Sequence, residues 1–320
     1  MRFSRLFLLS LIVALLVSLP GCLFRTRKVQ ILSTGPSLNA TLDQLVDKIN
    51  TEASKVQSLD ATVNIDTSVG GTRKGTITEY QEISGYILLR RPSMIRMIGL
   101  FPLVRNKAFD MVSDGKAFKL WIPVKNKFYV GHNDVVKPGG STLENLRPEA
   151  IYDALVFQPI DPGKDIAVLE TDNPISVDEK TKRVTEGATY AVDVITKNTD
   201  GKYYLQRKVI FDRVDLIPDH QVFYDKQGNV ATKVEYQDFR YFNNVRFPTV
   251  ILIKRPQEEY DITLAITKLT LNEPLKDDQF ALEQPPGSQL VDLDRQDVNA
   301  GSGTNADGTP SNPQPTSPHR

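Results

Sequence analysis

Cysteine and histidine are scarce in this sequence, and neither sign of charge is in excess. Cys22 is the only cysteine in 320 residues, so the chain offers no internal disulfide, no CxxC redox pair and no thiolate metal site. None of the three histidines belongs to an HExxH or other paired metal-ligand spacing. Lys and Arg number 39, as do Asp and Glu, so no basic surplus points to nucleic acid. The fold must therefore be stabilised by its apolar core.

Motifs of common enzyme classes are also missing. The sequence contains no GxSxG elbow and no P-loop. The run at residues 301–306 fits a GxGxxA dinucleotide pattern, but it lies in a polar tail with no strand before it. Asp292, Asp294 and Asp297 could attract calcium weakly, although a solvated domain end is the better interpretation. We therefore predict that the protein is not an enzyme and uses no cofactor or metal.

The first 21 residues have the pattern of a secretion signal. Two arginines precede an apolar stretch from Leu6 to Leu19, which is shorter than the roughly 20 residues that span a bilayer. Small Gly21 then marks a cleavage point, so we predict residues 1–21 to be a lipoprotein signal peptide. The run LPGC, which ends at Cys22, resembles a bacterial lipobox, although Pro20 stands where Ala, Ser or Val is preferred.

The lipobox resemblance implies that Cys22 carries acyl chains such as palmitate, and two chains suffice for stable anchoring. Leu23 lacks the acidic character that retains enteric lipoproteins at the inner membrane. We therefore predict a lipid-anchored, periplasm-facing protein of the outer membrane, with the inner membrane as the alternative. A secreted protein with an incidental cysteine is the other interpretation.

Composition divides the rest of the chain into three parts. Residues 22–37 contain the acylated Cys22 and an unpatterned tether. Residues 38–293 have the apolar patterning of one folded domain. Residues 294–320 are rich in Gly, Ser, Asn, Thr and Pro, so this tail is predicted to be disordered.

Hydrophobic periodicity predicts the elements of the folded domain. Apolar residues recur at helical spacing over residues 38–56, where Thr41 and Gln44 could form a capping box. Pro148 suits the first position of a second helix. Between and after these helices, segments of period two are separated by short turns such as the Asp-Gly turn at residues 113–116.

These elements predict a mainly β fold with α. Each strand has one dry face, and the only other apolar surfaces belong to the two helices. The simplest arrangement is an incomplete antiparallel β-barrel of about ten to eleven strands, with helices covering its concave apolar face around a cavity.

Several loose motifs of the domain follow a familiar order and spacing. They are SLDA at 58–61, GYILLRRPS at 85–93, VSDGK at 112–116, LWIP at 120–123, Phe280, and PPG at 285–287. In these motifs the domain resembles the LolA and LolB group of periplasmic lipoprotein carriers and outer-membrane receptors. The resemblance is weakest between roughly residues 160 and 190. The resemblance implies a helix-lidded barrel whose apolar interior holds the acyl chains of lipoproteins or lipids, with a periplasmic carrier protein as its partner. We expect the protein to be a monomer.

Arg91 matches a family arginine that hydrogen-bonds the backbone of a lid helix, so the resemblance makes it a lid-gating candidate. A guanidinium offers five donors in a fixed fork, which suits the orphan carbonyls at a helix end. The alternative is an arginine at a strand end that extends into water.

Leu103 follows Pro102, where the receptor form of the family carries a protruding apolar residue implicated in membrane delivery. With Phe101 and Leu100 it is the candidate membrane-insertion loop, because exposed apolar patches often mark membrane contacts. The alternative, slightly favoured by the pattern, is that the whole apolar run at 97–104 is core strand.

Together these expectations describe a membrane-anchored lipoprotein. It would bind acyl chains in an apolar cavity and take part in lipoprotein or lipid sorting or insertion at the outer membrane. The main alternative is a structural or assembly lipoprotein that uses the same fold as a protein-binding scaffold, and a hydrolase with an unrecognised site is the third.

Overall fold

The computed structural model describes residues 31–33, 37–71, 75–133, 147–172, 175–177, 184–186 and 188–294. The predicted signal peptide, Cys22, most of the tether and residues 295–320 lie outside the described residues.

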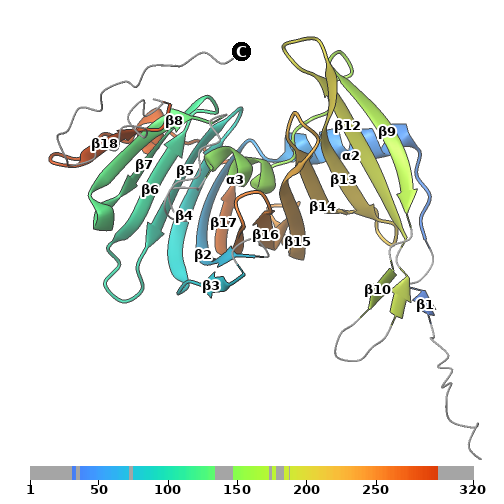
Figure 1. The fold of residues 1–320 in the computed structure, drawn as a ribbon. Coiled ribbons are helices and arrows are strands. Elements are labelled where there is room, and N and C mark those ends of the chain that lie inside the picture. Colours follow the sequence, from blue (N-terminus) through green and yellow to red (C-terminus); the bar gives the residue numbers. More distant parts are fainter. Residues whose placement is uncertain are drawn as a thin grey trace, which may run out of the picture.

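One sheet of 15 strands dominates the described chain (Figure 1). Nearly all neighbours pair antiparallel, and the strands at its two ends do not pair with each other, so the sheet is not closed. Its first half consists of β18 (Gln289–Asp292), β8 (Lys127–His132), β7 (Ala117–Ile122), β6 (Lys107–Ser113), β5 (Met94–Leu100), β4 (Ile83–Arg90) and β2 (Ser58–Gly70), with β3 (Ile77–Glu79) beside β2.

The second half continues from β2 in the order β17 (Tyr260–Leu271), β16 (Val245–Arg255), β15 (Val230–Phe242), β14 (Pro218–Tyr224), β13 (Tyr203–Asp212), β12 (Thr189–Lys197) and β9 (Asp165–Asp172). A separate three-stranded sheet contains β1 (Ile31–Ser33), β11 (Val184–Glu186) and β10 (Ile175–Val177). The early strand β2 pairs with the late strand β17, so the two halves form one continuous surface.

The predicted strand number, ten to eleven, is therefore wrong. β9 was missed because it lies in the region with the weakest family resemblance, and its outward side chains are largely exposed. β18 was missed because four residues carry no period of their own, and it forms only through parallel pairing with β8. The mainly β character, the incomplete closure and the predominantly antiparallel pairing are confirmed.

Two α-helices are described, α2 (Leu42–Lys55) and α3 (Pro148–Leu155), together with short 3-10 turns η2 (Pro123–Lys125) and η4 (Asp277–Phe280). The predicted capping box is confirmed: Gln44 N donates to Thr41 Oγ1, and Thr41 N donates to Gln44 Oε1. Pro148 stands in the first turn of α3, as the sequence predicts.

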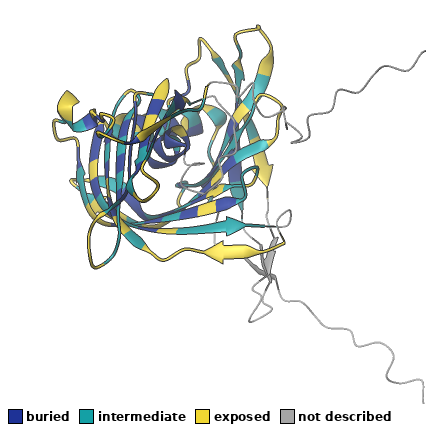
Figure 2. Ribbon diagram, turned by 60° about the vertical axis from the view of Figure 1, so that its left-hand side comes forward, coloured by how far each residue is buried: buried dark blue, intermediate teal, exposed yellow. Residues whose placement is uncertain are grey.

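Each helix covers a different part of the sheet. Ile151 and Leu155 of α3 pack into the larger core with the strands of the first half and the middle of the sheet. Leu45 and Ile49 of α2 pack into a second core with β12 and β13. Figure 2 shows α3 as a buried helix inside the curve of the sheet, with exposed residues on the outer faces and turns.

Candidate binding site

Arg91 joins the ends of both helices. Its Nε donates to the carbonyl of Val56 at 2.8 Å, and its Nη2 donates to the carbonyl of Phe157 at 2.6 Å. Val56 is the C-cap of α2, and Phe157 follows the C-cap of α3. These carbonyls have no partner within their own helices, so one guanidinium satisfies both and ties α2 to α3. The structure thus places Arg91 at the helix junction, whereas its predicted role in gating stays a prediction.

A tyrosine of α3 adds a second tie to the same strand end. The Tyr152 hydroxyl donates to the carbonyl of Pro92 at 2.7 Å. Burial raises the pKa of Tyr152 to about 12, so the hydroxyl keeps its proton at neutral pH and remains a donor. The β4–β5 turn therefore anchors α3 from two successive residues.

A small apolar pocket lies where the helix ends meet the middle of the sheet. Its volume is about 50 Å³, well below the roughly 300–1,000 Å³ of typical ligand pockets. Val56 and Phe157, whose carbonyls accept hydrogen bonds from Arg91, both line it. The main apolar side chains around it belong to Val56, Leu155, Val156, Phe157, Phe239 and Phe247.

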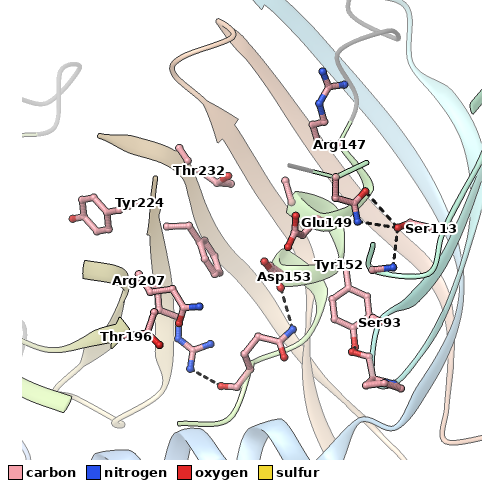
Figure 3. A pocket seen from close by; sticks show the side chains of 18 of the residues that line it. Ser93, Ser113, Arg147, Glu149, Tyr152, Asp153, Thr196, Arg207, Tyr224 and Thr232 are labelled. Atoms are coloured by element: carbon pink, nitrogen blue, oxygen red, sulfur yellow. Dashed lines mark hydrogen bonds between the residues drawn. The ribbon is translucent and has the colours of Figure 1, made fainter. Parts of the chain in front are cut away.

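A larger and more polar cavity of about 690 Å³ also borders α3 (Figure 3). Its walls come from the start of α3, the segment after α3, the β4–β5 turn and strands β12 to β16. The charged residues that line it are Arg147, Glu149, Asp153, Asp161, Lys164, Asp165, Arg207, Arg255 and Glu258. The acyl-binding prediction assumed an apolar interior, so this polar cavity differs from that expectation.

Asp153 of α3 lies between this cavity and the core. Gln158 Nε2 donates to its Oδ1 at 3.0 Å. Burial raises the pKa of Asp153 to about 6, against the smaller lowering effects of Gln158 and of the Arg207 and Arg91 charges. The carboxyl is therefore partly protonated under mildly acidic conditions.

Sequence reasoning overlooked Arg207. Its side chain is 2% exposed, and its Nη2 donates to the carbonyls of Gln158 at 2.6 Å and Pro159 at 3.4 Å. The signal was present in the strand pattern, because Arg207 shares one face of β13 with the buried Val209 and Phe211. An arginine at an inward position of an alternating strand marks a polar site.

The candidate insertion loop is the turn between β5 and β6. Leu103 is 99% exposed and has a φ of 65°, and Val104 beside it is also exposed. The interpretation of the whole run as core strand is therefore wrong, because the strand ends at Leu100. Leu100 is half-buried, and Phe101 packs against the main core, so these two candidates belong to the base of the turn.

Other exposed apolar residues lie at the same end of the first half. Ile77 of β3 pairs with the last residue of β2. Val124 lies in the turn that follows β7. Tyr80 follows β3 directly and is exposed as well. In Figure 1 these turns lie along the lower edge of the first half of the sheet. They and Leu103 form what we call the apolar end, made of Ile77, Tyr80, Leu103, Val104 and Val124.

One histidine and three aromatic residues that could have served a ligand site have structural contacts instead. His132 Nδ1 lies 2.7 Å from Asp294 Oδ2, and the backbone N–H of His132 donates to Asp294 Oδ1. Phe118, Phe128 and Tyr129 are buried, as interior packing requires. Within the described ranges, no three His, Cys, Asp or Glu residues lie close enough to hold a metal ion. The helices of those ranges are too short or too polar to cross a bilayer.

The chain was compared with family models, curated proteins and solved structures. A family model described as an uncharacterized protein matches residues 165–284. No curated protein matches the sequence.

Similar solved structures include a LolA superfamily protein from Nitrosomonas europaea, at 14% identity and a TM-score of 0.47, covering 76% of this chain and 99% of that one. A DUF1329 family protein from Desulfovibrio piger has 14% identity and a TM-score of 0.47, over 75% and 95% of the two chains. A proposed outer membrane lipoprotein-sorting protein domain from Vibrio parahaemolyticus has 11% identity and a TM-score of 0.46, also over 75% and 95%. These comparisons assign no activity to this chain.

Proposed function

We propose that this protein is a non-enzymatic, membrane-anchored lipoprotein that binds acyl chains and takes part in lipoprotein or lipid sorting at the outer membrane. The observation that carries the proposal is the junction at Arg91. One guanidinium holds the ends of both helices over an apolar pocket, at the sheet's concave side. The motif resemblance to the LolA and LolB group supports the same function.

The pocket would work by opening. At about 50 Å³ it is too small for an acyl chain, so the described arrangement corresponds to a closed state. Separating the helix ends would break the two hydrogen bonds of Arg91 and uncover the apolar side chains beneath them. An acyl chain would then stabilise the open state at about 0.8 kcal/mol per buried methylene.

The apolar end would meet the membrane. Its turns also carry basic residues, among them Arg105 and Lys125, which would be attracted to anionic lipid headgroups. Figure 1 places β1, the described segment nearest to Cys22, toward the same lower side of the molecule. An anchor on Cys22 and the apolar end would thus face one bilayer. Leu103 supports this role, because a leucine that is fully exposed at positive φ gains nothing from folding.

Lipid analysis of the purified protein tests the proposal. The protein, produced without residues 1–22, would be extracted and its lipids identified by mass spectrometry, and uptake of a fluorescent fatty acid would be measured in parallel. We expect acyl chains in the extract and saturable uptake. A folded protein with neither would leave the scaffold function as the better account, which the large polar cavity would then serve.

Replacement of Leu103 by Glu tests the membrane contact. We expect binding to vesicles that contain anionic lipid to weaken at least fivefold, while the free energy of unfolding changes by less than about 0.5 kcal/mol, because the side chain packs on nothing. Vesicle co-sedimentation and chemical denaturation measure the two quantities.

Tyr241→Glu is the matched control, since Tyr241 is exposed near the end of β15, away from the apolar end. It should leave vesicle binding unchanged. Equal losses in both variants would show that added charge alone weakens binding and would remove Leu103 from the mechanism.

A further inference from the structure

Arg207 is a buried cation without a carboxylate partner close by. Its side chain is 2% exposed, and its two hydrogen-bond acceptors are neutral carbonyls. Among the described residues, no carboxylate oxygen forms an ion pair with it within 4.0 Å, and its Nε has no hydrogen-bond partner. Arg207 also lines the 690 Å³ cavity.

Such a placement is costly without a ligand. A guanidinium stays charged in proteins, and a buried charge destabilises the fold unless an opposite charge compensates it. Burial lowers the pKa of Arg207, against the smaller raising effects of the Asp153 and Asp165 charges. Because the cavity is open to a ligand beside this group, a bound anion could supply the missing charge.

The nearby acids offset this charge only in part. The Asp153 and Asp165 charges act on Arg207, but among the described residues neither forms an ion pair with it within 4.0 Å. Glu258 is committed to Arg255, whose Nη2 donates to its Oε1. Asp153 accepts from Gln158, and its raised pKa reduces its negative charge near pH 6. Asp161, at the rim, lies 3.5 Å from Lys164 and is exposed.

The wall around Arg207 also offers hydroxyl donors. Thr232 Oγ1 accepts from Arg255 Nη1 at 2.8 Å, which leaves its own proton free to donate to a ligand. Thr196 lies two residues along β12 from Val194, the register partner of Arg207, and lines the same cavity (Figure 3). Guanidinium and hydroxyl donors on one wall suit the oxygens of a phosphate or a carboxylate.

We propose that this cavity binds an anionic oxygen group, a phosphate or a carboxylate, whose charge is compensated by Arg207. The group could belong to a lipid headgroup or to a small free anion, and the cavity admits either. The site is distinct from the apolar pocket under Arg91, so it goes beyond acyl-chain binding and does not depend on it.

Three probes separate the possibilities in calorimetric titrations of the purified protein. They are oleoyl lysophosphatidic acid, which has a chain and a phosphate; monoolein, which has the same chain and no charge; and inorganic phosphate. We expect the lysophosphatidic acid to bind at least tenfold more tightly than monoolein, as charge-assisted hydrogen bonds predict. Phosphate binding alone would indicate a free anion, whereas failure of phosphate with success of the lysophospholipid would indicate a headgroup. Equal affinity for the lysophospholipid and monoolein, with no phosphate binding, would overturn the proposal whatever the variants do.

Arg207→Gln identifies the residue. The substitution should lower the affinity for lysophosphatidic acid, or for phosphate if phosphate binds, at least tenfold. The affinity for monoolein should not change. Arg240→Gln, on the exposed side of β15, is the matched control and should change neither. Undiminished binding of the charged probe by folded Arg207→Gln would refute the assignment. If that variant does not fold, Thr232→Val is measured instead, and undiminished anion binding would count equally against this wall.

Discussion

Two hollows border the same short helix, and they differ in both size and chemistry. The apolar pocket at the end of α3 has a volume of about 50 Å³, whereas the polar cavity has about 690 Å³. Apolar walls attract one another in water, so an empty apolar pocket tends to collapse. Walls that carry buried arginines and acids hold water and resist collapse. The proposed function therefore requires the small pocket to widen when a ligand enters it.

Enlarging the apolar pocket should produce the largest change in the free energy of unfolding. Phe247→Ala removes a buried ring from its wall, and we expect a loss of about 3–5 kcal/mol in the free energy of unfolding. A fatty acid should fill the space, so oleate should raise the melting temperature of this variant more than that of the wild type. Thermal unfolding with and without oleate measures both.

Phe211→Ala is the comparison variant, because Phe211 is fully buried in the second core, away from the pocket. It should be destabilised to a similar degree with no extra rescue by oleate. An equal rise in melting temperature for the two variants would mean that oleate binds wherever a void exists. The apolar pocket would then not be a specific acyl-chain site.

A smaller effect is expected from Asp153, at the boundary of the polar cavity. Its pKa is raised to about 6 by burial, so the native state holds a proton that the unfolded state has released. Stability should therefore fall as the pH rises from about 4 to about 6 and should stay low above that. Asp153→Asn should remove this fall and gain roughly 2 kcal/mol relative to the wild type at pH 8.

Denaturation curves between pH 4 and pH 8 measure the effect. Asp66→Asn, at an exposed position of β2, should keep the wild-type pH dependence. A wild-type and an Asp153→Asn profile that run parallel would show that Asp153 does not titrate in this range.

The sequence predicted best those features that depend on neighbours in the chain. The capping box at Thr41 and Gln44 formed as expected, and the Asp-Gly turn closed the β6–β7 hairpin, where Asp114 accepts from the N–H groups of Lys116 and Ala117. Both depend on contacts within four residues. The position of Arg91 near a helix end followed from the resemblance, whereas its simultaneous contact with two helices did not.

Features that depend on distant pairing were missed. β18 exists only because it pairs with β8, more than 150 residues earlier in the chain. A cavity between the helices and the sheet was expected. The presence of two hollows of different chemistry was not, because their walls combine α3 with strands from the second half of the sheet. The apolar run around Leu103 was ambiguous, since short apolar runs suit a core strand and an exposed turn equally.

The central claim is that Arg91 keeps the apolar pocket closed, and stopped-flow uptake of a fluorescent fatty acid by Arg91→Leu tests it most directly. Loss of the two helix-end hydrogen bonds should speed uptake several-fold, because opening limits entry. Arg90→Leu is the control: Arg90 donates to the Leu275 carbonyl and to Asp277, on the other side of the strand. The account predicts faster uptake for Arg91→Leu alone. Identical uptake rates for the wild type and a folded Arg91→Leu would contradict it.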